Sequence, residues 1–527
     1  MDRREFFRMM AGAAAASGGL GALATSCVTR PGSGGQPEMT SRPNLLFIFA
    51  DQLRYQSTGL GGERQVHTPT LDAFASEGVN FTDAISNTPV CTPYRAITLT
   101  GRYAHTCGPF TNFLRLPDEE RTLGEVLKAQ GYNTGYIGKW HLSGARGVEY
   151  EPPGAGRHGF DYWASFAFNH RHNKDVYYAD GPEPVWGDGY QTDGETERAI
   201  KFIERQTAEK PFCLFVSWGP PHPPYAAWNM PPKYLERYGT VEEIARSNLN
   251  EKQLRPWASW QKPIRFTPRK PSHRANVEGN RLNDFAVATY YAMTDWVDDC
   301  FGRILATLER AGLAQNTIVV FSSDHGEMLG SHGMRGKMVF YEESVRIPFL
   351  VRWPARIRPR TTSDACISSV DFLPTLLGLM DVPVPDNVQG MDLSHCALLT
   401  LGAPGPEPDG AIIASYTGYE HYNPGWEYRG VRTKRYTYAR SLQELWMDYG
   451  PRKGRTYGDE PQYFLFDNAN DPYQTTDLAA DPKHKAVVEE LEAKVKGYLD
   501  ETGDGFHPAP YYKQFPDEKG RLVRPVR

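Results

Sequence analysis

Cysteine is scarce in this chain of 527 residues, which contains only seven. No two of them have Cys-x-x-Cys spacing, so neither a zinc cluster nor a thioredoxin-type redox motif is expected. Five remain once Cys27 and Cys91 are given the roles described below. We expect most of these five to be small buried residues, with a single disulfide left open as an alternative.

The chain also lacks an excess of charge and lacks long apolar runs beyond its N-terminus. Lys and Arg number 58 against 63 Asp and Glu, for a net charge of −5, which argues against a general nucleic-acid binder. No later stretch approaches the roughly 18 apolar residues of a transmembrane helix, which excludes a multi-pass membrane protein. Glycine (50) and proline (41) stay below the share that marks disordered or fibrous chains. The composition is that of a globular protein.

Residues 1–36 are expected to be a leader and tether rather than part of the fold. Arg3 and Arg4 precede a weakly apolar run over 9–23, a pattern similar to Tat export signals. Residues 23–27 (Leu-Ala-Thr-Ser-Cys) resemble a lipobox with Cys27 as the acylated residue, and an ordinary cleavage site is the alternative. We therefore expect export by the Tat translocase to the periplasm or cell surface, with membrane contact only through a lipid on Cys27.

The body of the chain alternates apolar strands with amphipathic helices. Continuous apolar runs cover residues 44–50, 211–218 and 317–321, and helical patterns cover 122–130 and 285–308. Strands that are apolar throughout are typical of a sheet buried on both faces. This order predicts an α/β fold with a large doubly wound, mixed but mostly parallel sheet flanked by helices, over residues 43–403.

The C-terminal quarter has a different sequence pattern. Strand patterns over 428–438 and 463–467 and a helical pattern over 486–499 predict a smaller α+β subdomain, which we place at 404–527. Residues 229–280 are rich in Pro, Trp, Arg and Asn with little periodicity, and we expect a long loop or lid there.

Polar residues follow several of the predicted buried strands. Asp51, His222, Asp324 and His325 come after the runs that begin at residues 44, 211 and 317. In open α/β sheets, ligands bind at the carboxyl edge of the strands. These four residues are therefore expected to form part of one site.

A stretch around Cys91 gives the most specific signal. Cys91-Thr92-Pro93-Tyr94-Arg95 with Thr100-Gly101 forms the pattern C-x-P-x-R-x4-T-G. Without further positions, the pattern is compatible with Cys91 as a low-pKa thiolate nucleophile or as a structural cysteine in a turn. The pattern resembles the signature of type I sulfatases, in the alkaline-phosphatase-like superfamily. The resemblance extends from about Pro43 into the C-terminal region, and implies that a formylglycine-generating enzyme converts Cys91 to formylglycine.

The resemblance implies roles for further positions. The metal ligands would be Asp51, Gln52, Cys91, Asp324 and His325, binding Ca²⁺, with Mn²⁺ or Mg²⁺ as alternatives. The catalytic residues would be Cys91, Arg95, Lys139, His141, His222 and Lys337. This chain departs from the usual family pattern at Gln52, Tyr94 and His325.

The implied reaction is hydrolysis of a sulfate ester. A hydroxyl of the hydrated aldehyde would attack sulfur, His222 would protonate the leaving oxygen, and His141 would act as the later base. Export favours a sulfated polysaccharide or oligosaccharide as substrate. Side chains that could contact the sugar are Arg54, His105, His170, Arg171, His172, Trp228, Trp257 and Trp260.

Two other functions remain open. Gln52 and His325 look similar to residues of phosphodiesterases and phosphonate monoester hydrolases in the same superfamily. A carbohydrate-binding lipoprotein without activity is the alternative from another class. Turnover of sulfate, phosphate diester and phosphonate substrates separates the three.

Overall fold

The computed structural model describes residues 42–144, 149–238, 284–398, 405–416, 427–443 and 457–505. The predicted leader with Cys27, most of the predicted lid, and Trp257 and Trp260 lie outside the described residues. Residues 41–527 form one compact unit. Among the described helices, none combines the length and apolar character needed to cross a membrane.

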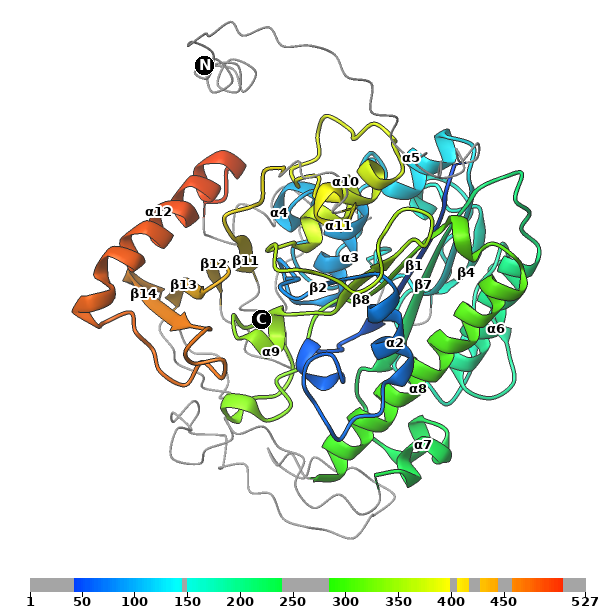
Figure 1. Cartoon of the computed structure of the whole chain (residues 1–527), viewed down its shortest axis with the longest axis horizontal. Coiled ribbons are helices and arrows are strands. Elements are labelled where there is room, and N and C mark those ends of the chain that lie inside the picture. The colour runs from blue at the N-terminus through cyan, green and yellow to red at the C-terminus, as the bar shows by residue number, and fades with distance from the viewer. Residues whose placement is uncertain are drawn as a thin grey trace, which may run out of the picture. The chain divides into compact units, whose positions relative to one another are not determined.

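The centre of the fold is an eight-stranded sheet with the strand order β10-β2-β9-β8-β1-β7-β3-β4 (Figure 1). The strands are β1 (Asn44–Asp51), β2 (Val79–Phe81), β3 (Asn133–Lys139), β4 (Tyr162–Phe166), β7 (Phe212–Pro221), β8 (Thr317–Ser323), β9 (Phe349–Arg352) and β10 (Thr361–Ser363). All neighbouring pairs are parallel except those of β9, which is antiparallel to β2 and β8. The predicted mixed, mostly parallel sheet is confirmed.

Helices cover both faces of this sheet, which explains why β1 is apolar throughout. Leu46 and Ile48 pack in one core cluster, and Leu45 and Phe47 pack in the other, as the alternation of side chains along a strand requires. The first cluster includes α2 (Pro69–Glu77), α6 (Gln191–Glu204), α7 (Pro232–Glu236) and α8 (Asp284–Arg310). The second includes α3 (Cys91–Thr100), α5 (Leu123–Ala129), α10 (Ser369–Leu379) and α11 (Ser394–Leu398).

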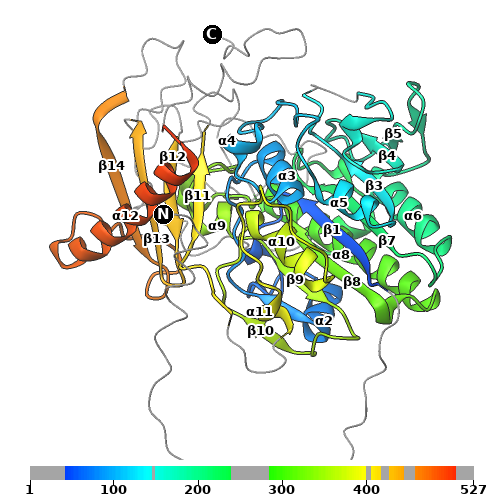
Figure 2. The same ribbon diagram turned by 90° about the horizontal axis from the view of Figure 1, so that it is seen from above.

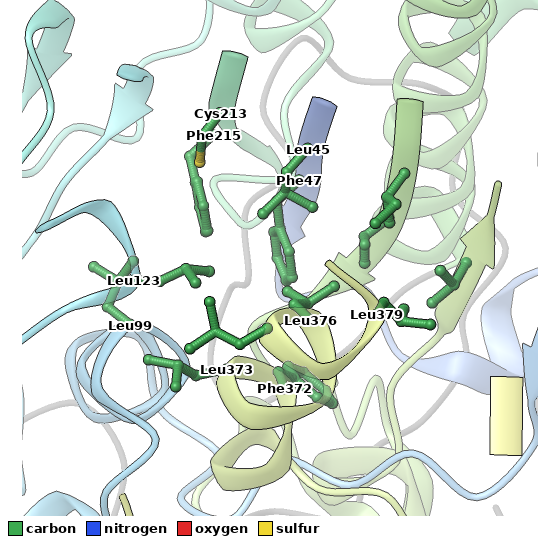
Figure 3. Packing of buried hydrophobic residues seen from close by; sticks show 14 of the residues in the cluster. Leu45, Phe47, Leu99, Leu123, Cys213, Phe215, Phe372, Leu373, Leu376 and Leu379 are labelled. Atoms are coloured by element: carbon green, nitrogen blue, oxygen red, sulfur yellow. The ribbon is translucent and has the colours of Figure 1, made fainter. Parts of the chain in front are cut away.

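Aromatic and leucine side chains fill the second cluster. Phe47 of β1 stacks on Phe215 of β7 with ring centroids 4.9 Å apart. Figure 3 shows both residues directed toward Leu373 and Leu376 of α10. This packing fixes β1 and β7, whose carboxyl ends carry polar residues, against the helix layer that contains α3.

The C-terminal region forms a second, antiparallel sheet. Its strands are β11 (Ala411–Ser415), β12 (Tyr428–Arg432), β13 (Tyr436–Gln443) and β14 (Tyr457–Asp467), and α12 (Lys485–Thr502) lies across one face (Figure 2). The predicted single strand over 428–438 was wrong, because the chain reverses between Arg432 and Tyr436. The Thr433 hydroxyl accepts a hydrogen bond from the Tyr436 amide, so a polar turn without glycine closes this hairpin.

The other face of the small sheet packs against the main unit. Phe464 and Phe466 of β14 contact Phe340, with the rings of Phe340 and Phe464 centred 4.9 Å apart. Val339 belongs to the same cluster. The C-terminal sheet therefore supports the segment that carries Lys337.

The six cysteines among the described residues are free and buried. This agrees with the expectation of small buried residues, and no disulfide joins the described residues.

Candidate active site

Four strands of the large sheet end at the same edge and place polar residues there. Asp51 is the last residue of β1, and Lys139 is the last residue of β3. His222 directly follows β7, and Asp324 directly follows β8. Parallel neighbours bring the carboxyl ends of these strands together, so residues far apart in sequence meet around one point.

Cys91 lies at the centre of these groups, as the first residue of α3. Its Sγ lies 3.5 Å from Asp51 Oδ1, 3.3 Å from His325 Nε2 and 3.3 Å from Lys337 Nζ. Burial, together with the charge of Asp51, raises the pKa of the Cys91 thiol to about 11. A thiolate nucleophile is therefore disfavoured at neutral pH.

Two buried carboxylates face this centre and titrate differently. Burial would raise the pKa of Asp51, but the positive charges around it, Lys139 foremost, hold it well below its usual range. Burial and the negative charge of Asp51 raise the pKa of Asp324 to about 6. A cation between the two would relieve this repulsion.

Arg95 ties several strands to α3. Its guanidinium donates to Ser217 Oγ and to the Lys139 carbonyl, both at 2.6 Å, and lies 3.3 Å from Asp324 Oδ2. Neighbouring Tyr94 is buried in the core beside Phe49, with ring centroids 6.0 Å apart. The core thus accommodates the unusual tyrosine of the motif.

The two lysines reach the centre from different elements. Lys139 Nζ donates to Asp51. Lys337 Nζ lies 2.7 Å from the side-chain oxygen of Gln52. Both lysines are buried, so their charges act with little screening from solvent.

Glu327 is a site residue that sequence reasoning missed. Its carboxylate accepts hydrogen bonds from the Gln52 amide and from the backbone amides of Leu329 and Gly336, the last at 2.6 Å. It therefore shapes the loop that leads to Lys337. Its position three residues after Asp324 was the available signal.

His141 is held beside the centre by both backbone and ring contacts. The Thr92 hydroxyl donates to the His141 carbonyl at 2.9 Å, and the ring packs on Phe168 with centroids 4.8 Å apart. Neither ring nitrogen has a hydrogen-bond partner among the described residues. Burial, and then the charges of Lys139 and Arg95, lowers its pKa well below the ordinary value, so the ring is neutral.

His222 is stacked on His170. The ring centroids are 3.5 Å apart and the planes differ by 7°. Burial and the charge of Lys337 lower the pKa of His222 well below its ordinary value. His172 contacts the His222 carbonyl through Nε2 at 3.2 Å. His170 and His172, expected near the sugar, thus belong to the His222 side of the site.

The other described residues expected in the sugar pocket are either bonded inside the protein or exposed. Arg54 is buried, where it donates to Ser57 Oγ at 2.6 Å and to the Met328 carbonyl, so its donors are used inside the protein. His105 bonds to Tyr416 Oη at 2.7 Å in the C-terminal region. Both side chains have partners inside the protein, and their contact with the sugar stays a prediction. Arg171 and Trp228 are exposed.

One cluster has the donor chemistry of a metal site. Potential ligand atoms of Asp51, Cys91, Asp324 and His325 all lie within 4.8 Å of one another. His325 Nδ1 lies 2.9 Å from the Gly326 carbonyl, so this nitrogen donates and Nε2 keeps its lone pair toward the cluster. Two carboxylates and one imidazole, with an oxygen at position 91 after conversion, fit a hard divalent cation. The Gln52 oxygen, predicted as a ligand, bonds to Lys337 in this structure.

Comparisons with known proteins agree with this arrangement. The family model described as Sulfatase matches residues 43–382, and that described as N-sulphoglucosamine sulphohydrolase, C-terminal, matches 330–501. The chain is 38% identical over 493 residues to an ulvan-active sulfatase of Formosa agariphila, covering 92% of this chain and 87% of the relative. It is 30% identical over 527 residues to an endo-4-O-sulfatase of Bacteroides thetaiotaomicron, covering 89% and 94%.

Solved structures give the same result. A protein in complex with its substrate, D-glucosamine-2-N,6-O-disulfate, matches with a TM-score of 0.72 and 25% identity, covering 88% of this chain and 99% of that one. A phosphonate monoester hydrolase of Agrobacterium radiobacter, at 22% identity and a TM-score of 0.66 over 88% and 96% of the chains, shares the fold. The matched family model spans well over half of the sequence and includes the whole cluster around Cys91. The chain therefore belongs to the sulfatase family and is a sulfuric ester hydrolase.

Proposed function

We propose that this protein removes sulfate from carbohydrates by using formylglycine at position 91 and a bound divalent cation. The observation that carries the proposal is the convergence on Cys91 Sγ of Asp51, His325 and Lys337, at 3.5, 3.3 and 3.3 Å. A buried cysteine with a raised pKa is a poor nucleophile, whereas an aldehyde at the same position, when hydrated, supplies a hydroxyl nucleophile.

The cation would be held by Asp51, Asp324 and His325, with Gln52 beside them. We favour Ca²⁺, with Mn²⁺ or Mg²⁺ as alternatives, because the ligand set is rich in carboxylate oxygen. When bound, the cation supplies positive charge for the sulfate oxygens.

Three buried side chains of this chain would bind the sulfate group. Arg95, Lys139 and Lys337 bring three positive charges to a centre that holds the carboxylates of Asp51 and Asp324, with Glu327 behind Gln52, so a bound divalent cation would leave the site with a net positive charge for an anion. Their burial strengthens this attraction and fixes the direction of the sulfate oxygens. The arrangement orients sulfur for attack from the side of residue 91.

The histidines would move protons. His222 is proposed to hold the proton for the leaving oxygen, and the negative charge of a bound sulfate ester favours this protonated form against the effect of burial. His141 is neutral, and neither ring nitrogen has a hydrogen-bond partner in the described part of the chain, which suits a base on the nucleophile.

Carbohydrate is the proposed substrate class because the relatives are named for such substrates. They include ulvan-active, endo-4-O- and N-acetylglucosamine-6-O-sulfatases. We further propose that a formylglycine-generating enzyme modifies Cys91 before Tat export, that the mature protein is periplasmic or on the cell surface, and that Cys27 carries a lipid anchor. Formylglycine is made on an unfolded chain, so modification in the cytoplasm fits an exporter of folded proteins.

Substitution of the proposed nucleophile tests the function. Cys91→Ala should lower turnover of sulfated oligosaccharides by about three orders of magnitude or more, because the nucleophile is lost. Cys396→Ala, at a buried cysteine in α11, is the matched control and should keep activity. Peptide mass spectrometry of the active protein should find an aldehyde at position 91. Unmodified Cys91 in fully active protein, or a preference for phosphate diesters or phosphonates over sulfate esters, contradicts the proposal.

Removal of the cation tests the metal site. Chelation should abolish sulfate ester hydrolysis and lower the melting temperature, because Asp51 and Asp324 then lose the cation that reduces their mutual repulsion. Ca²⁺, Mn²⁺ and Mg²⁺ added back separately should differ in how far they restore activity. Unchanged activity and melting temperature after exhaustive chelation would contradict a required cation.

A further inference from the structure

The stacked pair of His170 and His222 is a feature that the proposed roles leave unexplained. The two rings lie face to face, with centroids 3.5 Å apart and planes differing by 7°. The Phe168 ring meets His170 nearly at a right angle, with centroids 4.4 Å apart and planes at 81°. His170 is thus confined between the Phe168 ring and the His222 ring.

A network of backbone contacts holds the two loops in this position. Asn229 Nδ2 donates to the carbonyls of His170 and Pro224, both at 3.2 Å. Asn229 Oδ1 accepts from the His172 amide at 2.7 Å, and His172 Nε2 contacts the His222 carbonyl at 3.2 Å. The loop after β4 and the loop after β7 are therefore joined where the rings stack.

The hydrogen bonds of His222 define which nitrogen faces the site. Nδ1 lies 2.8 Å from the Pro223 carbonyl, so Nδ1 donates to this oxygen and Nε2 is the atom available for substrate. Both ring nitrogens of His170 lack a hydrogen-bond partner among the described residues. The contacts of His170 are therefore made through its ring faces and edge.

A cation shared by Asp51, His170 and His222 is the competing interpretation, because ligand atoms of these residues lie within 4.8 Å of one another. The geometry of the stack opposes it. A nitrogen lone pair lies in the plane of its ring, and the planes of two nearly parallel stacked rings do not meet at bonding distance, so one ion cannot lie along a lone pair of each ring. The stacking of His170 on His222 is better suited to holding the plane of the His222 ring than to binding a cation.

We propose that His170 is a positioning residue, which holds the His222 ring by stacking so that Nε2 faces the leaving oxygen. This inference rests on the proposed function, in which His222 is the acid. As the attacking oxygen bonds to sulfur and the bond between sulfur and the sugar oxygen breaks, the electron pair of the broken bond stays on the sugar oxygen, the Nε2 proton moves to that oxygen, and His222 is left neutral. A ring free to rotate about χ1 and χ2 presents Nε2 to the oxygen for less of the time.

Leaving-group dependence gives a direct test. 4-Nitrophenyl sulfate has a leaving group that departs without a proton, whereas a sugar sulfate needs one. His170→Ala should lower kcat on a sugar sulfate that the wild type hydrolyses by about tenfold or more, and kcat on 4-nitrophenyl sulfate by less than about threefold. His170→Phe retains a ring for stacking and should recover most of the loss. Lys174→Ala, an exposed change in the same loop, is the matched control.

Each outcome decides the proposal. The proposal is overturned if His170→Ala lowers kcat equally on the two substrates or does not lower it on the sugar sulfate. It is also overturned if His170→Phe is as impaired as His170→Ala. A Zn²⁺ ion bound by the wild type and lost from His170→Ala would also overturn it, in favour of a cation site. If His170→Ala does not fold by circular dichroism, His170→Phe alone decides, since a large selective loss on the sugar sulfate contradicts stacking.

Failure of the underlying function has a separate signature. His222→Ala should show the same selective loss on the sugar sulfate, larger than that of His170→Ala. Equal losses in His222→Ala would refute the acid role of His222 itself. No turnover of either sulfate by the wild type would refute the proposed function.

Discussion

Arg95 shows how a single buried side chain can serve both stability and catalysis. It contacts Ser217, the Lys139 carbonyl and Asp324, so it joins the ends of β3, β7 and β8 to α3. Its charge is fully buried, and burial opposes the charged form while the neighbouring carboxylates favour it. The guanidinium therefore stabilises the site only as long as its partners are present.

Loss of this guanidinium should be costly. Arg95→Met leaves Asp324 without its cation, and we expect the free energy of unfolding to fall by about 3–5 kcal/mol, as for other broken buried ion pairs. Arg358→Met, at an exposed position, should change it by less than about 0.5 kcal/mol. Urea denaturation followed by circular dichroism measures both. If Arg95→Met lowers the free energy of unfolding no more than Arg358→Met does, the buried contacts of Arg95 do not stabilise the fold.

At this scale, the sequence predicted the residues of the site better than their contacts. A motif around Cys91 and the polar ends of strands pointed to Asp51, Lys139, His222 and Asp324, and the structure places these side chains together. Glu327 escaped prediction because its role depends on two backbone amides that only the folded loop brings near it. The burial of Arg54 escaped for the same reason, since the sequence does not show which carbonyls a charged residue will meet.

At the scale of elements, the end of β3 depends on a glycine. Gly138 has φ of +94°, and a Cβ there would lie 2.1 Å from the Ser217 carbonyl oxygen of β7. Only glycine permits both the backbone conformation and this close approach. The approach places Lys139 beside Asp51 and Ser217 beside Arg95.

Alanine at this position should therefore disturb the site and not only the strand. Gly138→Ala should lower both the unfolding midpoint and kcat. Gly131→Ala, also at positive φ (+85°) but with nothing within 4 Å, should cost only the backbone strain of about 1–2 kcal/mol and keep kcat. The pair separates strain from steric contact. Equal effects of the two changes on kcat would contradict a role for the β3–β7 approach.

The strands of the large sheet were predictable because their apolar runs have polar ends, whereas the C-terminal hairpin was not. Residues 428–438 keep a strand-like pattern through Thr433 and Arg435, and the turn relies on a threonine hydroxyl. Turn chemistry of this kind carries no glycine or proline signal. The turn between β12 and β13 was therefore not predicted, although the region was correctly predicted to be α+β.

At the scale of the whole molecule, the C-terminal sheet supports the segment that carries Lys337. Phe464 and Phe466 pack on Phe340, three residues after Lys337. We propose that residues 43–403 and 404–527 act as a catalytic domain and a dependent subdomain, with this shared core between them.

A polar contact links the two parts on another side. His105, from α4 (Ala104–Cys107), lies 2.7 Å from Tyr416 Oη and stacks edge-on with Tyr498 of α12. Burial lowers the pKa of His105 to about 4. The unfolded chain binds a proton at this histidine below about pH 6.5, while the folded protein does not do so until about pH 4. The stability that neutral His105 contributes is complete above pH 6.5 and falls as the pH falls toward 4.

Replacement of His105 should therefore flatten the dependence of stability on pH. Between pH 7.5 and 5 the wild type should lose about 2 kcal/mol that His105→Gln does not lose, because glutamine keeps a hydrogen-bond acceptor without titrating. His67→Gln, at an exposed histidine, should follow the wild type. Urea midpoints of the three proteins at both pH values measure the difference. If His105→Gln and the wild type lose stability in parallel, the folded protein binds a proton at His105 as readily as the unfolded chain does. The contact of His105 with Tyr416 then does not make stability depend on pH.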